Sequence, residues 1–382
     1  MILSGQRTTF HLSQTLEVPQ GVLIRTNGPQ SVRINGQGVI NTRHLETKYV
    51  VSGKGTLPYI YVIHKTLEIN TWDRDQVKQE VAVTLETETP DQAEQLRNAL
   101  RPVLALAAGN VLSLTCELNI AQFSVNNGWF REDRNSITLS DGRVFPVKYL
   151  EINNRFFVPE TASLDLKLSR TNLSLGDHIG PIELQQAFGQ VSGGCLGEMT
   201  AQLTDAIVRI DKLDEANLRL TNCELHLSQV GKMTMNTSLS GGKIDSVGQL
   251  LINKSVSDRF TFRRVDVGIA AGVFFSTIDI GELGHSWQLT GKRATLSVGK
   301  VNEALESFQV DNQDGVIHFP LNDLSGYKLW CDNPTKNNYQ LPATLTKKSG
   351  GEVASYYEFE AVKNTSIVRL TGQRCEFWLR PE

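Results

Sequence analysis

The sequence predicts a mainly β protein, built from several solenoid-like or sandwich-like β domains, with one capped α-helix near residues 90–108. Apolar and polar residues alternate in short runs such as SLDLKL, ELHLS and KMTM. Such alternation is typical of strands, because successive side chains point to opposite faces. Gly, Asn, Asp and Ser fill the gaps between the runs, as expected of turns. The clearest helical spacing of apolar residues follows Thr89.

The region of residues 161–301 has the most regular alternation. Apolar pairs such as Val208/Ile210 and Leu218/Leu220 recur at short intervals. The turns between them lack the Asn-Gly and Asp-Gly pairs of tight hairpins, which favours stacked coils. Asparagines at the strand edges would suit amide ladders between coils, but Asn is also a common turn residue. A β-solenoid and a β-sandwich both remain open.

The predicted helix has a well-defined start. Thr89 is a good N-cap, Pro90 fits the first helical position, and Gln92 completes a capping box. Pro102 lies inside the predicted range, so we expect a kink or a break there. The segment SITLSDGRVFPV predicts a hairpin with Asp141-Gly142 at its tip. We therefore expect one helix packed on a small antiparallel sheet. The apolar stripe of the helix consists of Leu96, Leu100, Val103 and Leu104.

The length of 382 residues indicates more than one core, because single cores usually stop growing near ~250–300 residues. We divide the chain into four segments at the changes of pattern. They are an N-terminal β-strand region (1–66), a small α+β domain (67–160), a repetitive-strand domain (161–301) and a C-terminal β cap or domain (302–382).

The charge and hydropathy pattern excludes several classes of function. Lys plus Arg (38) nearly balances Asp plus Glu (41), so no basic footprint for nucleic acid is present. The longest apolar runs are well short of the ~20 residues of a membrane helix, so we expect no membrane insertion. The first residues, MILSGQRTTF, lack a signal-peptide pattern, which predicts cytoplasmic synthesis. A virion or a similar assembly could still carry such a protein outside the cell.

Motifs for metal or cofactor chemistry are missing from the sequence. The seven histidines form no HExxH spacing. The five cysteines are an odd number without a CxxC pair, which is typical of reduced thiols in a core. We therefore predict no metal site and no cofactor.

Carboxylate pairs beside aromatic residues are the remaining candidates for chemistry. Glycoside cleavage uses two carboxyl groups, and aromatic faces stack on sugars. Each pair lies in a polar, turn-like segment, where a solvated surface position is the common alternative. The candidates are Asp73 and Asp75 with Trp72, Glu132 and Asp133 with Trp129, and Asp311 with Asp314.

One stretch of the chain is similar to a known family. The segment FHLSQTLEVPQGVLIRTNGPQSVRINGQGV (residues 10–39) resembles the first coils of right-handed β-helix proteins of the pectate-lyase and phage-tailspike kind. The resemblance implies stacked parallel strands and transfers no functional residue. The predicted helix near 90–108 departs from the family pattern, because it would interrupt a continuous β-helix.

These observations favour a non-enzymatic structural or attachment protein, such as a component of a phage or virus particle. Its expected partners are proteins, in a homo-oligomer or a larger assembly, and a surface glycan. Two alternatives remain. One is a carbohydrate-active β-helix enzyme, which requires carboxylates converging in a groove with aromatic residues. The other is a β-rich recognition module of an intracellular bacterial defence system.

Overall fold

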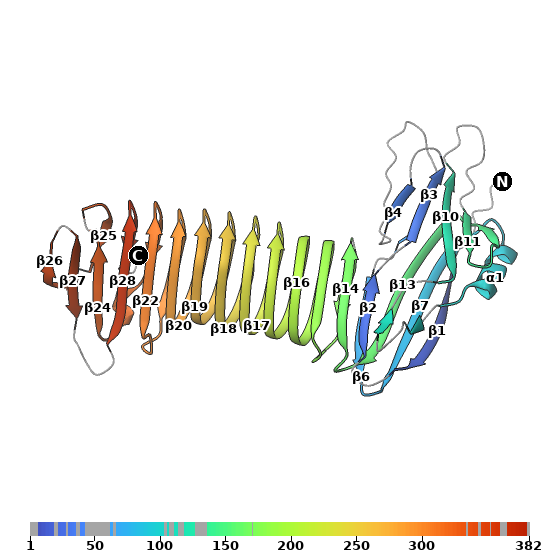
Figure 1. Cartoon of the computed structure of the whole chain (residues 1–382), viewed down its shortest axis with the longest axis horizontal. Coiled ribbons are helices and arrows are strands. Elements are labelled where there is room, and N and C mark those ends of the chain that lie inside the picture. The colour runs from blue at the N-terminus through green and yellow to red at the C-terminus, as the bar shows by residue number, and fades with distance from the viewer. Residues whose placement is uncertain are drawn as a thin grey trace. The chain divides into compact units, whose positions relative to one another are not determined.

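The computed structural model confirms a mainly β chain, with 74% of residues in strands and a β-solenoid of about eight turns (Figure 1). Contacts divide the chain into two compact units, Met1–Leu196 and Gly197–Glu382, called unit 1 and unit 2 below. The structure describes residues 7–18, 22–27, 30–35, 39–42, 62–63, 66–102, 105–106, 111–113, 118–126, 136–169, 171–333, 335–342, 345–351, 353–359 and 365–379.

Unit 1 combines an antiparallel sheet with parallel strands. Strand β7 pairs antiparallel with β1 on one side and with β13 on the other, and β13 also pairs parallel with β6. Its elements are β1 (Thr8–Glu17), β2 (Leu23–Asn27), β3 (Gln30–Asn35), β4 (Val39–Thr42), β5 (Val62–Ile63), β6 (Thr66–Trp72), β7 (Gln76–Glu86), α1 (Pro90–Ala99), β8 (Ala105–Leu106), β9 (Val111–Ser113), β10 (Ile120–Asn126), β11 (Ser136–Leu139), β12 (Val144–Pro146), β13 (Tyr149–Pro159), β14 (Ser163–Ser169), β15 (Asn172–Leu175) and the first part of β16 (Ile182–Thr221).

The first strand is not a solenoid coil, in contrast to the implication of the β-helix resemblance. Its residues pair antiparallel along their whole length, from Thr8 with Leu85 to Glu17 with Gln76. Parallel stacking starts only with β2, which lies between β14 and β9. Alternation specifies that every second residue is buried, but it does not specify the direction of the partner strand.

Helix α1 confirms the predicted start and corrects the predicted end. The Thr89 side chain accepts the backbone N–H of Gln92 at 3.3 Å, and Pro90 is the first helical residue. The helix ends at Ala99 rather than at residue 108. The ring of Pro102 disfavours the helical conformation of the residue before it and supplies no N–H, so the helix stops ahead of it.

The apolar face of α1 closes the core of the antiparallel sheet. Leu96, Ala99 and Leu100 are buried in one cluster with side chains of β7, β11 and β13. Val103 and Leu104 of the predicted stripe lie outside the described residues. The predicted hairpin is present, because β11 pairs antiparallel with β12 around Gly142, whose φ is +86°.

Unit 2 is mainly a stack of parallel coils, with antiparallel strand pairs near its C-terminal end (Figure 1). Its elements are the rest of β16, β17 (Glu224–Ser238), β18 (Gly241–Val256), β19 (Arg259–Phe274), β20 (Thr277–Lys292), β21 (Thr295–Val301), β22 (Ser307–Gln313), β23 (Val316–His318), the 3₁₀ turn η1 (Leu321–Asp323), β24 (Tyr327–Asp332), β25 (Asn338–Gln340), β26 (Thr346–Gly350), β27 (Ala354–Phe359), β28 (Ser366–Gln373) and β29 (Glu376–Trp378).

The inward side chains of unit 2 stack on one another from coil to coil. The apolar pairs found in the sequence occupy these inward positions, where they are buried. One such row is formed by Leu218, Met235, Ile252, Ala270 and Leu289. Burial of apolar surface along these rows supplies the main stabilisation of the coils. The open choice between a solenoid and a sandwich is thus resolved in favour of the solenoid.

A left-handed residue turns each coil at the same corner, called the αL corner below. Its backbone N–H donates to a carbonyl of the next coil, for example from Leu239 to Val256 at 3.0 Å and from Ser257 to Phe274 at 3.0 Å. The backbone ladder therefore continues around the turn. The αL residues of unit 2 are Asp205, Asn222, Leu239, Ser257, Phe275, Arg293, Asp314, Asn333 and Arg374.

A buried polar network fills the αL corner of the middle coils. The carboxylate of Asp258 is 4% exposed and accepts four hydrogen bonds from the neighbouring turns. The hydroxyls of Thr237 and Ser255 each lie 2.6 Å from Oδ2. The backbone N–H groups of Ser240 and Val256 donate at 2.7 and 2.9 Å. This carboxylate thus joins two consecutive coils.

Replacement of Asp258 by alanine should destabilise unit 2. The backbone N–H groups of Ser240 and Val256 would lose their carboxylate acceptor, and each buried donor left unpaired costs about 1–3 kcal/mol. We expect a loss of roughly 3 kcal/mol or more in the free energy of unfolding, measured by urea denaturation followed by circular dichroism. The control is Asp279→Ala, because Asp279 points outward on β20. Equal stability of the two variants would contradict the role given to the network.

A second prediction concerns pH and His178 of unit 1. This side chain is 3% exposed, its Nε2 lies 2.8 Å from the Ala162 carbonyl, and its Nδ1 has no partner. Burial lowers the pKa of His178. As the pH falls, His178 is therefore protonated in the unfolded state before it is protonated in the folded state. The contribution of neutral His178 to stability is complete above about pH 6.5 and declines below that value.

The measurement is the free energy of unfolding as a function of pH for the wild type and His178→Gln. His178→Gln should reduce the acid-side slope by up to about 1.4 kcal/mol per pH unit, since it removes one linked proton. An unchanged slope in His178→Gln would refute the assignment, whatever its absolute stability.

Candidate functional site

A polar groove crosses the last coils of unit 2. Strands β20, β22 and β28 lie side by side in parallel register there. Their side chains form rows across the strands, and we call a set of in-register side chains that face solvent an outward row. The first outward row of the groove contains Thr290, Asp311 and Thr371. The second is formed by Lys292, Gln313 and Gln373.

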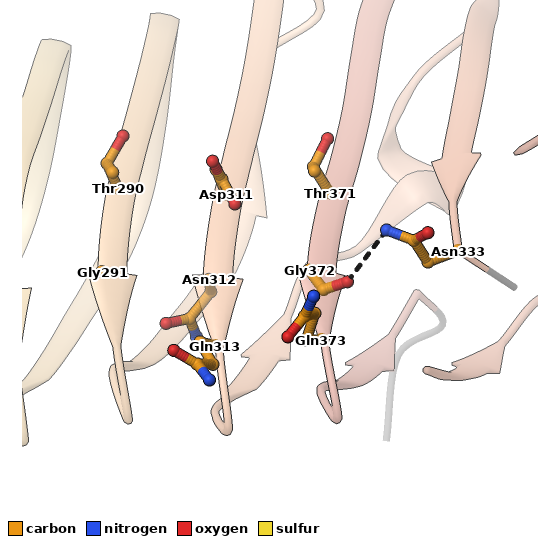
Figure 2. Close-up of a pocket in the computed structure, with 9 residues that line it drawn as sticks. All are labelled: Thr290, Gly291, Asp311, Asn312, Gln313, Asn333, Thr371, Gly372 and Gln373. Carbon is orange, nitrogen blue, oxygen red and sulfur yellow. Dashed lines mark hydrogen bonds between the residues drawn. The ribbon is translucent and has the colours of Figure 1, made fainter. Parts of the chain in front are cut away.

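The groove lies over the row between these two (Figure 2). Its volume is about 390 Å³, which is within the range of small-molecule sites, about 300–1,000 Å³. Asn333, after β24, closes one end and donates to the carbonyl of Gly372 at 3.3 Å (Figure 2). The lining residues are Thr290, Gly291, Asp311, Asn312, Gln313, Asn333, Thr371, Gly372 and Gln373.

The middle row consists of Gly291, Asn312 and Gly372. Gly372 has to be glycine, because a Cβ there would lie 2.7 Å from the Asn312 carbonyl oxygen and 3.0 Å from Cys375 Sγ. Asn312 is buried and donates from Nδ2 to the Ala294 carbonyl at 2.9 Å, while its Oδ1 has no partner.

Several polar groups of the groove are free to bind a ligand. Within the described part of the chain, the side chains of Asp311, Gln313 and Gln373 make no hydrogen bond or ion pair. The Thr371 hydroxyl donates to Asp332 Oδ2 at 2.8 Å, so its oxygen can still accept. The groove thus presents two amides on adjacent coils, Gln313 and Gln373, about 4.8 Å apart. The carboxylate of Asp311 lies two residues before Gln313 on the same strand.

An aromatic side chain lies beside the groove, in the neighbouring outward row. Gln288, Gln309, Arg369 and Trp330 are paired in register in this row. Trp330 is half-buried, and the Arg369 guanidinium lies 5.8 Å from the centre of its ring. Its ring is also 5.0 Å from the ring of Tyr356, at 39°. The site therefore combines polar groups with an aromatic edge.

The carboxylate pair Asp73/Asp75 lies in unit 1, in the turn between β6 and β7. Both side chains are exposed. The indole N–H of Trp72 donates to the carbonyl of Gln76 at 2.7 Å, and the Arg74 guanidinium lies 5.2 Å from its ring. The pair Glu132/Asp133 and Trp129 lie outside the described residues. The assignment of these residues to a site remains a prediction.

The third candidate pair is divided between two environments. Asp311 lines the groove, whereas Asp314 is the αL residue of its coil and pairs with Arg374, with Nε and Oδ1 2.6 Å apart. Sequence reasoning therefore found Asp311 but missed Gln313 and Gln373. The coils differ in length. Parallel pairing of β22 with β28 therefore places Thr371 and Gln373 beside β22, although they are far from Asp311 in the sequence.

The described cysteines and potential metal ligands form no binding site. Cys223, Cys331 and Cys375 are buried free thiols, and Cys195 is exposed. Burial raises the pKa of Cys331 to about 12. Among the described residues, no three His, Cys, Asp or Glu side chains are grouped so that they could hold a metal ion. The described helices include none with the length and apolar composition of a membrane span.

Comparisons with known proteins find two solved structures. No family model and no curated protein matches the chain. A candidate adhesin from Parabacteroides distasonis is 11% identical, with 98% of this chain and 97% of the other covered and a TM-score of 0.24. A candidate cell adhesion protein from Clostridium sporogenes is 10% identical, with 98% and 100% covered and a TM-score of 0.16. Both scores are too low to bear on the fold or the function of this chain.

Proposed function

We propose that this protein is a non-enzymatic attachment protein that binds a surface carbohydrate in the groove of unit 2. The observation that carries the proposal is the set of unpaired polar side chains in the groove, Asp311, Gln313 and Gln373, beside the aromatic ring of Trp330. Carboxylate and amide groups accept and donate hydrogen bonds to hydroxyls, and an aromatic face packs on the apolar face of a sugar ring.

The groove favours binding over cleavage. Glycoside hydrolysis requires two carboxyl groups about 5–9.5 Å apart. The lining of this groove, all of it described, contains one carboxylate, that of Asp311. Asp314 is held by Arg374 at the αL corner and is not part of the lining. A single carboxylate can orient a sugar hydroxyl without supplying both catalytic roles.

Affinity electrophoresis of the full chain in gels that contain dextran, mannan, xylan or chondroitin sulfate tests this proposal. At least one polysaccharide should retard the wild type. Asp311→Ala should weaken binding about ten-fold or more, because a hydrogen bond to a charged group contributes about 1.5–3 kcal/mol. Trp330→Ala should also weaken it. Asp279→Ala, which removes a carboxylate on another outward row, is the matched control.

Two outcomes would contradict the carbohydrate site. One is the absence of retardation by every polysaccharide, and the other is equal retardation of Asp311→Ala and the wild type. New reducing ends in the same mixtures would instead support the alternative of a carbohydrate-active enzyme. Loss of these ends in Asp73→Asn and Asp75→Asn would then assign cleavage to unit 1.

A homo-oligomer or larger particle, such as a virion component, is the second part of the proposal. A single groove with few polar contacts binds weakly, and linked copies raise the avidity without new contacts. Multi-angle light scattering of the full chain should therefore give a mass that is a multiple of one chain. A monomer at all concentrations tested would contradict this part and leave the carbohydrate site to be judged on its own assay.

A further inference from the structure

The αL corner of unit 2 carries large apolar side chains that face solvent. Leu239 is 63% exposed, Phe275 is 55% exposed and Phe274 is 40% exposed. Leu239 and Phe275 are the αL residues of coils that lie two apart, with Ser257 between them. Coils are about 4.8 Å apart, so the two apolar tips are roughly 10 Å apart along one edge.

The backbone conformation makes these residues unexpected at the tips. Their φ angles are +52° for Leu239 and +55° for Phe275. Bulky L-residues are disfavoured in this region, whereas Asn, Asp and Gly adopt it more readily. Other coils of unit 2 follow that preference with Asn222 and Asp314. Because the Leu239 and Phe275 side chains are mostly exposed, burial within this chain does not offset the conformational cost.

The surroundings of the tips are positively charged. Three adjacent outward rows cover this edge, and over four coils they contain cations but no carboxylate. We call these residues the basic apolar ridge. It consists of Ser238, Val256, Phe274 and Lys292, of Leu239, Ser257, Phe275 and Arg293, and of Gly241, Arg259, Thr277 and Thr295. On the preceding coil, the exposed Glu224 is in register with Gly241 and lies 2.7 Å from His226 Nε2.

Two of the three cations of the ridge lack partners in the described chain. Arg259 and Lys292 make no ion pair there, and Arg293 lies over the ring of Phe275 at 5.2 Å from its centre. The nearby carboxylate of Asp258 is buried and already accepts four hydrogen bonds. At the end of the edge, Asp314 is paired with Arg374. The ridge thus combines free positive charge with exposed apolar tips.

We propose that the basic apolar ridge docks on the surface of an anionic lipid bilayer. A convex edge with Leu and Phe at its tips can insert into the boundary between headgroups and acyl chains. The cations beside them would pair with lipid phosphates and carboxylates, as basic residues do at anionic membranes. This site adjoins the carbohydrate groove through the row of Lys292, and it needs no membrane-spanning segment.

Co-sedimentation of the full chain with vesicles tests this proposal. The vesicles are phosphatidylcholine alone, or phosphatidylcholine with 30% phosphatidylserine, each at low and at high salt. We expect binding to the anionic vesicles at low salt, with weaker binding at high salt and to the neutral vesicles. Lys292→Gln and Arg293→Gln should each weaken the binding about five-fold.

The decisive variants are Leu239→Asn and Phe275→Asn, which retain a residue suited to the αL conformation. Each should lower vesicle binding at least ten-fold and leave the melting temperature equal or higher. Ser257→Asn is the matched control on the same edge and should bind as the wild type does. No binding to anionic vesicles, or undiminished binding by both variants, would overturn the proposal. A lowered melting temperature in both would assign the tips a structural role instead.

Discussion

The backbone ladder between successive coils is the constraint on which the rest of unit 2 depends. At the αL corner, each coil turns without breaking the ladder, because the N–H of the turning residue reaches a carbonyl of the next coil. The next residue points inward and is small or hydrogen-bonded, as Cys223, Ser240 and Asp258 are. Buried backbone groups must be paired, so this repeat fixes the register of every coil.

The groove and the ridge both follow from that register. Parallel coils in register place the side chains of distant sequence positions about 4.8 Å apart in straight rows. Asp311 and Thr371 are neighbours on this account, and so are Gln313 and Gln373. Lys292 belongs to the same row as these glutamines, and this row continues into the ridge through Phe274 to Ser238. The surface chemistry of unit 2 therefore changes gradually from apolar and basic to polar along its rows.

The sequence predicted which residues point inward better than it predicted which strands pair with each other. Alternation located buried residues such as Leu218 and Met235, and local signals located the N-cap Thr89 and the hairpin at Gly142. The alternation did not predict strand direction, since β1 alternates like a solenoid strand but pairs antiparallel. The expected ladders of asparagine side chains are absent at Asn217 and Asn236, which are paired in register with Thr234 and Arg219. The sequence identified Asp311 as a candidate carboxylate. It did not predict that Gln373 lies beside Gln313, because no local sequence pattern records the coil lengths that bring them together.

The same constraint separates stability from function within unit 2. Inward rows and the αL corner determine whether the coils stack, and the inter-coil hydrogen bond imposes the turn conformation whatever side chain stands at the tip. That is why Asp, Asn, Ser, Arg, Leu and Phe all occur there with φ between 51° and 57°. An outward or tip residue can therefore change with little effect on packing. Exposed Leu239 and Phe275 act against conformational preference and hydration alike, so they are best explained by contacts made outside the chain.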